Sequence, residues 1–285
     1  MTPAEARAQF NTQIQRDESS NDMGLELDRA ALLIAAESYP SLEVESYLRQ
    51  LDELAAQARA NDVPHASPVT RILRLNDLMY GEWGFHGNAE DYYDARNSFF
   101  NEVLDRRTGI PITLSVVYME VARRLGLPLV GVGLPGHFIV KYQPPDTEDE
   151  DEIFIDPFNE GRLLLEEDCF RMVLQMYQGR VVFERRLLDT VTKRQILARM
   201  LQNLKGIYAR ANDHAKALSA IERVMLIQPA AEELRDRGLV LAALHRYPQA
   251  IADLESYLRT KPEPKEAQAI QEKLKELKQR QAQWN

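Results

Sequence analysis

Three runs of sequence decide the expected fold. They read G-I-P-I-T-L-S-V-V-Y-M-E-V-A-R-R-L-G-L-P (109–128), L-P-G-H-F-I-V-K-Y (134–142) and I-F-I-D-P-F-N-E-G (153–161). The first run is apolar nearly all round, which is typical of a helix enclosed by other elements. The other two read as strands, one beginning at His137 and one ending at Asp156, with a further strand expected over 130–134. Together they predict a buried helix, a strand that carries His137, an acidic loop and a strand that ends in Asp156.

Composition places the chain among ordinary globular proteins, with 45% apolar and 28% charged residues over 285 positions. The net charge of −9 argues against a nucleic-acid or anionic-membrane binder, because affinity for phosphate needs a basic face. Cys169 is the only cysteine, so no intrachain disulfide can form and a reducing, cytoplasmic location is expected. The apolar run 30–36 is far shorter than the roughly 20 residues of a membrane span, and residues 1–7 have no apolar core of signal-peptide type.

An all-helical lobe is expected before the central run. Residues 1 to about 23 are polar and predict a weakly ordered lead-in, with room for one helical turn. Apolar residues at helical spacing then predict helices over 27–38, from Ser41 onward, and over roughly 68–80.

Residues 80–97 read Y-G-E-W-G-F-H-G-N-A-E-D-Y-Y-D-A-R-N and predict a glycine-rich loop. Its aromatic residues either pin the loop to the body of the protein or line a groove, and pinning is the favoured interpretation. A groove would be lined by Trp83, Tyr92 and Asn97, with Pro111 from the central helix.

Metal and cofactor sites are not expected. No Cys or His partner stands at metal-binding spacing from His86. Residues 146–152 hold six acids in seven positions and predict a solvated hairpin tip, since the oxygen-ligand pattern and internal glycine of a calcium loop are missing.

The C-terminal third of the sequence repeats itself. Pro229 and Pro262 lie 262 − 229 = 33 residues apart, and Ala217 aligns with Ala250, a spacing similar to that of the tetratricopeptide repeat. Each unit is a helical hairpin that needs a stacked neighbour to bury its apolar face. We expect a repeat domain over 191–285 after a first domain over 1–190. The array either binds a protein or peptide partner through its concave face or only buttresses the first domain.

His137 and Asp156 are the candidate chemical pair. If their strands are antiparallel neighbours, His137 can lie opposite Asp156, and the carboxylate would orient the imidazole and fix its tautomer. The alternative is a hydrogen bond that merely closes a hairpin.

The run 109–161, with its P-G-H-F and I-D-P-F-N-x-G motifs, resembles the transglutaminase-like core of a bacterial SirB-type family whose members carry C-terminal tetratricopeptide repeats. The resemblance covers roughly 27–262 and implies a papain-like α+β fold, in which the central helix packs on a small antiparallel sheet. It also implies that His137 and Asp156 occupy two of the three catalytic positions. The family's cysteine lies about 15 residues before the glycine of the R-x-L-G-[IL]-P turn, and 126 − 15 = 111 places Pro111 there.

Proline has no nucleophilic side chain, although it suits the first turn of a helix. At about 100° per residue, Thr113 points away from position 111, whereas Ser115 lies on nearly the same face one turn deeper. Three hypotheses follow. The favoured one is a non-catalytic interaction or regulatory protein without a cofactor. The second is a hydrolase or acyl-transferase that uses Ser115 or Thr113, and in the third Cys169 reaches the pair from the next helix.

Overall fold

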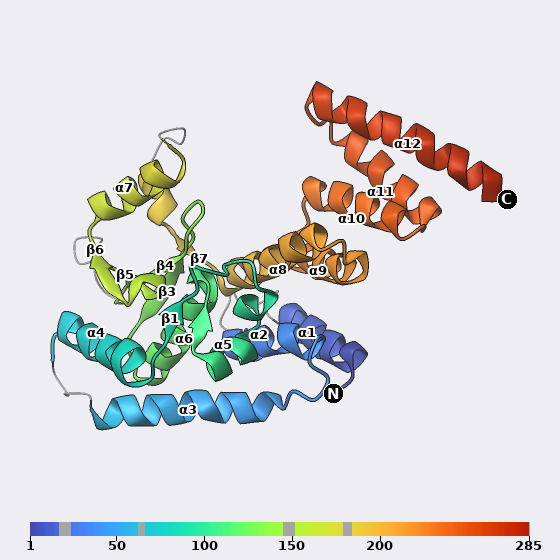
Figure 1. Ribbon diagram of the computed structural model, residues 1–285. Coiled ribbons are helices and arrows are strands. Elements are labelled where there is room, and N and C mark those ends of the chain that lie inside the picture. The colour runs from blue at the N-terminus through green and yellow to red at the C-terminus, as the bar shows by residue number, and fades with distance from the viewer. Residues whose placement is uncertain (17–23, 62–65, 145–151, 179–183, 285) are drawn as a thin grey trace. The chain divides into compact units, whose positions relative to one another are not determined.

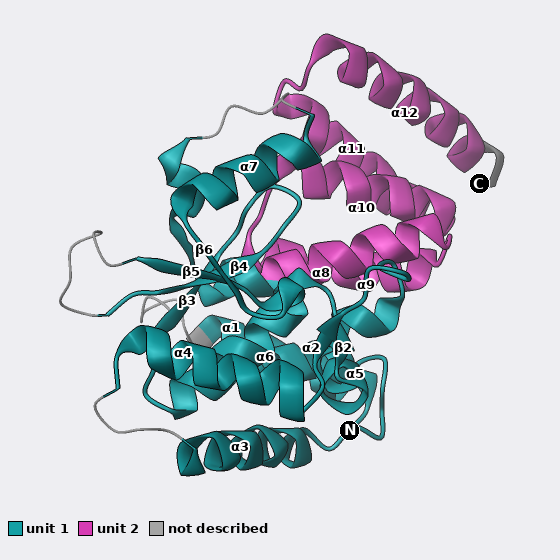
Figure 2. Ribbon diagram, turned by 60° about the vertical axis from the view of Figure 1, so that its left-hand side comes forward, with its two compact units in different colours: residues 1–197 teal, residues 198–285 magenta. Residues whose placement is uncertain are grey.

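The computed structural model describes residues 1–16, 24–61, 66–144, 152–178 and 184–284. The chain divides into two compact units, residues 1–197 and 198–285, which are coloured separately in Figure 2. The domain boundary expected from the sequence lay between residues 190 and 191. The acidic run 146–152 falls, apart from Glu152, outside the described residues.

Unit 1 is built on an antiparallel sheet with the strand order β6-β5-β4-β3-β7 (Figure 1). Three strands lie where alternation predicted them: β3 (Leu129–Val132), β4 (Ile139–Tyr142) and β5 (Ile153–Asp156). Two edge strands were not predicted, because three and two residues are too few to show a periodicity: β6 (Arg162–Leu164) and β7 (Thr190–Val191). The strand expected from His137 begins two residues later, because a turn closed by the His137 N–H and the Leu134 carbonyl precedes it.

Helix α6 (Pro111–Arg124) is the central helix that the sequence predicted. Every residue from 111 to 122 is buried. Pro111 occupies the first turn, where its missing N–H costs nothing. The helix packs against β3 and β4 and is enclosed by α2 (Leu27–Ala36), α3 (Val44–Ala60) and α5 (Phe100–Arg106). The prediction of an α+β core is therefore confirmed.

A second apolar cluster joins the sheet to α7 (Glu166–Met176). Cys169 and Val173 of this helix are fully buried against Val132, Ile139 and Phe154. Helix α6 therefore packs against strands β3 and β4, and α7 packs against the sheet through this separate apolar cluster.

The prediction of a weakly ordered N-terminus was wrong for residues 3–16. They form α1 (Pro3–Arg16), and Ala6, Phe10 and Ile14 are at most 1% exposed. These residues recur every four positions and so share one face of the helix, which packs on α2. Because most of the segment is polar, these three apolar positions did not indicate a helix in the sequence.

The connection between α3 and α6 is more regular than a loop. Helix α4 (Pro68–Asn76) continues into a π-helical segment, η1 (Asp77–Glu82), which together cover the helix expected over 68–80. Two residues of β1 (His86–Gly87) then pair in parallel with β2 (Thr108–Gly109). Nε2 of His86 lies 3.0 Å from Oγ1 of Thr108, so this histidine holds the short ladder.

Unit 2 consists of stacked helices, as the repeat predicted. The aligned residues Ala217 and Ala250 are both fully buried. A Cβ at Gly238 would lie 2.7 Å from Cγ of Leu254, so this glycine allows two helices to approach closely. The helices are α8 (Lys193–Arg210, which begins in unit 1), α9 (His214–Ile227), α10 (Ala231–Ala243), α11 (Tyr247–Arg259) and α12 (Pro264–Trp284).

Candidate functional site

The structure brings His137 and Asp156 together. Nε2 of His137 lies 2.9 Å from Oδ2 of Asp156, and the two residues are 5% and 1% exposed. Strands β4 and β5 pair Val140 with Ile155, and continuing this register places His137 two residues beyond the position opposite Asp156. The imidazole therefore reaches the carboxylate from the turn that precedes β4.

Asp156 also organises the chain that follows it. Its Oδ1 accepts hydrogen bonds from the backbone N–H groups of Phe158 (3.1 Å) and Asn159 (3.3 Å), and its Oδ2 accepts one from Nδ2 of Asn159 (2.7 Å). The carboxylate thereby caps the 3-10 turn η4 (Pro157–Asn159). Burial alone would raise the pKa of Asp156, but the hydrogen bond and charge of His137 and the bonds from Asn159 hold it below 3.8.

The ionised carboxylate can only accept hydrogen bonds, so Nε2 of His137 carries the proton in this pair. Nδ1 is then the ring nitrogen that would face a nucleophile in a triad.

Aromatic side chains extend from the pair to the surface. The ring of Phe158 meets the imidazole of His137 edge-on at 6.1 Å between centroids, and Tyr92 meets Phe158 at 6.3 Å. Tyr93 packs on Tyr92 at 5.4 Å and is 60% exposed. A Cβ at Gly87 would lie 2.7 Å from the Phe158 ring, so this glycine makes room for it. Phe158 stands in the quoted I-D-P-F-N-E-G run, but sequence reasoning assigned it no role.

Neither hydroxyl candidate is bonded to His137. Oγ1 of Thr113 accepts from the Ile110 N–H (3.1 Å) and donates to the Asn97 carbonyl (2.8 Å), which fixes the first turn of α6. Ser115 is fully buried, and its Oγ has no hydrogen-bond partner in the described part of the chain. Pro111, where the resemblance led us to expect the family's cysteine position, is buried in the same turn.

Cys169 is a core residue, as the sequence favoured. Its side chain is fully buried on the sheet, and burial, with the nearby charge of Asp168, raises the pKa of its thiol to about 12. A thiol in this state is protonated at neutral pH and is a poor nucleophile.

We expect Cys169 in the folded protein to react with Ellman's reagent at pH 8 at least 100-fold more slowly than after unfolding, because burial blocks access and keeps the thiol protonated. Absorbance at 412 nm with and without guanidinium measures this ratio. Rapid labelling of the native protein would contradict the burial and would make Cys169 a candidate nucleophile again.

The residues expected to line a groove fall into two groups. Nε1 of Trp83 donates to Oε1 of Gln57 on α3 at 2.9 Å, so Trp83 pins its loop to that helix. Asn97 is fully buried, and its Nδ2 donates to the Asp91 carbonyl at 2.7 Å, so it also holds the loop. Of the three loop residues, Tyr92 alone joins the aromatic chain that leads to His137.

A buried polar contact beside the pair escaped sequence reasoning. The hydroxyl of Tyr118 on α6 donates to Oδ1 of Asn76 (2.7 Å), and Nδ2 of Asn76 donates to the Gly161 carbonyl (2.7 Å). Gly161 has φ +68° and no room for a Cβ, which would lie 2.1 Å from Oδ1 of Asn76. This contact fastens the end of the η4 segment to α6. The glycine of the I-D-P-F-N-E-G run was the signal that could have revealed it.

The described residues hold neither a candidate metal centre nor a candidate membrane span. Among them no group of three or more His, Cys, Asp or Glu side chains could hold a metal ion. Across the same residues, no helix has the length and apolar character needed to cross a membrane.

Comparison with known proteins adds a family context. The sequence model of the transglutaminase-like superfamily matches residues 45–202, and that of the tetratricopeptide repeat matches residues 204–275. A UPF0162 protein of Xylella fastidiosa is 37% identical over 246 residues, which cover 85% of this chain and 86% of the relative. Another, of Pseudomonas aeruginosa, is 32% identical over 252 residues, with coverages of 88% and 90%.

A similar region occurs in a longer animal protein. F-box only protein 21 of Mus musculus is 35% identical over 140 residues, which cover 48% of this chain and 21% of that protein. No solved structure matches the chain.

Proposed function

Because the chain belongs to the transglutaminase-like superfamily, with UPF0162 proteins as relatives and tetratricopeptide repeats after its transglutaminase-like domain, we propose that it is a non-catalytic member that acts by binding a protein or peptide partner. Tetratricopeptide repeats commonly mediate such binding. The acidic net charge and the single cysteine favour a cytoplasmic protein that does not bind nucleic acid or membranes.

One observation carries the proposal. A nucleophile–base pair needs the attacking group within hydrogen-bond reach of the base. None of Thr113, Ser115 and Cys169 makes a hydrogen bond to His137 in the described structure. Each of these three side chains is instead fully buried within unit 1. The pair then serves to hold η4 and the aromatic side chains beside it.

A hydrolase or acyl-transferase is the second candidate, and Ser115 is the observation that favours it. A buried hydroxyl without a partner is uncommon in folded proteins and calls for a physical reason. To act as a nucleophile, Ser115 would have to move into reach of His137, with Asp156 as the orienting acid.

The binding surface that we propose on unit 1 is the aromatic patch, defined as Tyr92, Tyr93 and Phe158 beside His137. Tyrosines are enriched among the residues that dominate interface energy, because they bury a large area with few rotatable bonds. The exposed Tyr93 ring supplies such an area next to a fixed backbone.

Alanine variants test the aromatic patch. In cross-linking pull-downs with the full chain, we expect Tyr92→Ala and His137→Ala to reduce recovery of co-purified proteins at least fivefold, since truncation of a central interface side chain commonly costs about 1–2 kcal/mol. Val69→Ala, an exposed apolar side chain on α4, is the control and should leave recovery unchanged. Equal recovery with all three folded variants would remove the patch from the proposal.

A further inference from the structure

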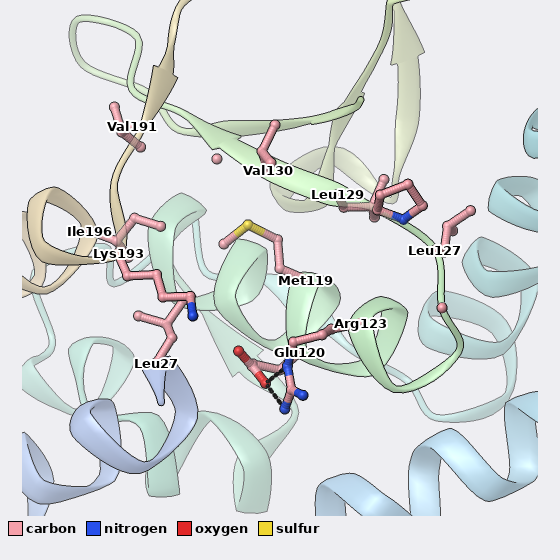
Figure 3. Close-up of a pocket in the computed structure, with 13 residues that line it drawn as sticks. Leu27, Met119, Glu120, Arg123, Leu127, Leu129, Val130, Val191, Lys193 and Ile196 are labelled. Carbon is pink, nitrogen blue, oxygen red and sulfur yellow. Dashed lines mark hydrogen bonds and ion pairs between the residues drawn. The ribbon is translucent and has the colours of Figure 1, made fainter. Parts of the chain in front are cut away.

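A cavity in unit 1 lies apart from the residues considered above. It has a volume of about 500 Å³ and opens between the second half of α6, the start of β3, and the beginning of α8 (Figure 3). Most of its walls are apolar, and neither His137 and Asp156 nor the three candidate nucleophiles borders it. The apolar side chains include Leu27, Met119, Leu127, Leu129, Val191 and Ile196. Cavities of this size commonly receive ligands.

The edge of β3 offers an unused peptide group at this cavity. The Gln143 N–H donates to the Pro128 carbonyl at 3.0 Å, which makes these two residues a hydrogen-bonded pair of the β3–β4 ladder. Hydrogen-bonded and non-bonded pairs alternate along an antiparallel ladder, so the backbone groups of Leu129 and Gly131 point away from β4.

On that side, β7 pairs only with Gly131 and Val132. Within the described residues no strand pairs there with Leu129, because the chain leaves β7 after Val191 and begins α8 at Lys193. The N–H and carbonyl of Leu129 therefore lie at the sheet edge, where Leu129 also lines the cavity.

The ionic groups at the cavity wall are paired within the protein. The guanidinium of Arg123 donates to Glu120 at 2.8 Å (Figure 3) and to Asp28 at 3.5 Å. Arg124 donates to the same two carboxylates. The ammonium of Lys193 donates to the Leu25 carbonyl at 2.7 Å. Recognition at this cavity therefore falls to its apolar walls and to the peptide group of Leu129.

We propose that this cavity and the β3 edge bind a short extended segment of another protein. The segment adds to the sheet beside Leu129 in line with β7 and places one apolar side chain in the cavity. Strand addition uses the peptide groups that an exposed edge leaves unpaired, and side-chain pockets supply its specificity. A simple alkyl chain would fill the cavity but leave the N–H and carbonyl of Leu129 unmatched. This site is separate from the aromatic patch and does not depend on it.

Selection from a random library tests the proposal. Phage-displayed twelve-residue peptides are panned on the full chain, and selected sequences are synthesised with a fluorescein label for anisotropy titrations. We expect the selected sequences to share one large apolar residue within an extended, proline-free stretch. Methylating the one peptide nitrogen that faces Leu129 should weaken binding about fivefold, the worth of one hydrogen bond.

Protein variants supply the matched comparison. Val191 pairs with Gly131 and its side chain shares the cavity side of the sheet, so Val191→Trp should fill the cavity and weaken binding at least tenfold. Thr190→Trp adds the same ring on the other face of β7 and should change binding less than twofold.

Three results would overturn the proposal. The first is that no peptide is enriched. The second is that N-methylation leaves the affinity of the selected peptides unchanged. The third is that the Val191→Trp and Thr190→Trp variants bind them equally well. Binding of decanoate but of no peptide would replace the protein segment with a small amphiphile.

Discussion

Replacing Asp156 with alanine is expected to lower the free energy of unfolding by about 3–5 kcal/mol, the cost typical of removing one partner from a buried, charge-assisted contact. The carboxylate is 1% exposed and accepts from His137, from Asn159 and from two backbone N–H groups. Alanine would leave the buried imidazole of His137 without its acceptor and would remove the carboxylate that caps η4. Urea unfolding followed by far-ultraviolet circular dichroism measures the change.

An exposed ion pair gives the control for Asp156. Glu45 bonds Arg29 at 2.6 Å, but its side chain is 64% exposed, so Glu45→Ala should change stability by less than about 0.5 kcal/mol. If Asp156→Ala were equally mild, the carboxylate would not be a structural element. A role in orienting His137 for catalysis would then be the better account of the carboxylate.

The same carboxylate predicts a dependence on pH. Because the folded-state pKa of Asp156 lies below its ordinary 3.8, its stabilising contribution is complete above that pH and is lost as the pH falls through the folded value. The stability difference between wild type and Asp156→Ala should therefore shrink only in strong acid.

Replacing Phe10 with alanine is expected to cost about 3–5 kcal/mol, as for other fully buried aromatic side chains. Phe10 has no exposed surface and sits on the stripe through which α1 packs on α2. If α1 were only a lead-in, as its polar composition indicated, the loss would be small. Urea unfolding again provides the measurement.

Gln9, the neighbour of Phe10, provides the control, since it lies on the exposed side of α1. Gln9→Ala keeps the helix propensity and should leave stability within about 0.5 kcal/mol of wild type. Equal effects of the two substitutions would show that α1 does not belong to the core.

Long or strongly patterned segments were predictable from the sequence. Helix α6 is apolar nearly all round, strands β3 to β5 lie in apolar stretches, and the helices of unit 2 repeat at a fixed spacing. These signals do not depend on tertiary packing. The proximity of His137 and Asp156 followed from antiparallel neighbours joined through residues 143–152. The pairing of β4 with β5 is observed, although the register differs by two residues.

Short or locally polar elements were not predictable. Strands β6 and β7 have too few residues for a pattern, and α1 shows only three core positions in a polar segment. The contact of Phe158 with Tyr92 and His137 joins segments 66 and 21 residues apart (158 − 92 = 66, 158 − 137 = 21), which no local pattern encodes. The edge left open at Leu129 depends on where β7 ends, so only the folded sheet reveals it.

The central claim is that no nucleophile works with His137. Its most direct test treats the full chain and its His137→Ala variant with a fluorophosphonate probe and with a panel of ester and amide substrates, while circular dichroism confirms that both are folded. The account predicts neither labelling nor turnover that distinguishes the two proteins. Labelling or turnover by the wild type that disappears in the His137→Ala variant would contradict it, and its loss in Ser115→Ala as well would identify the nucleophile.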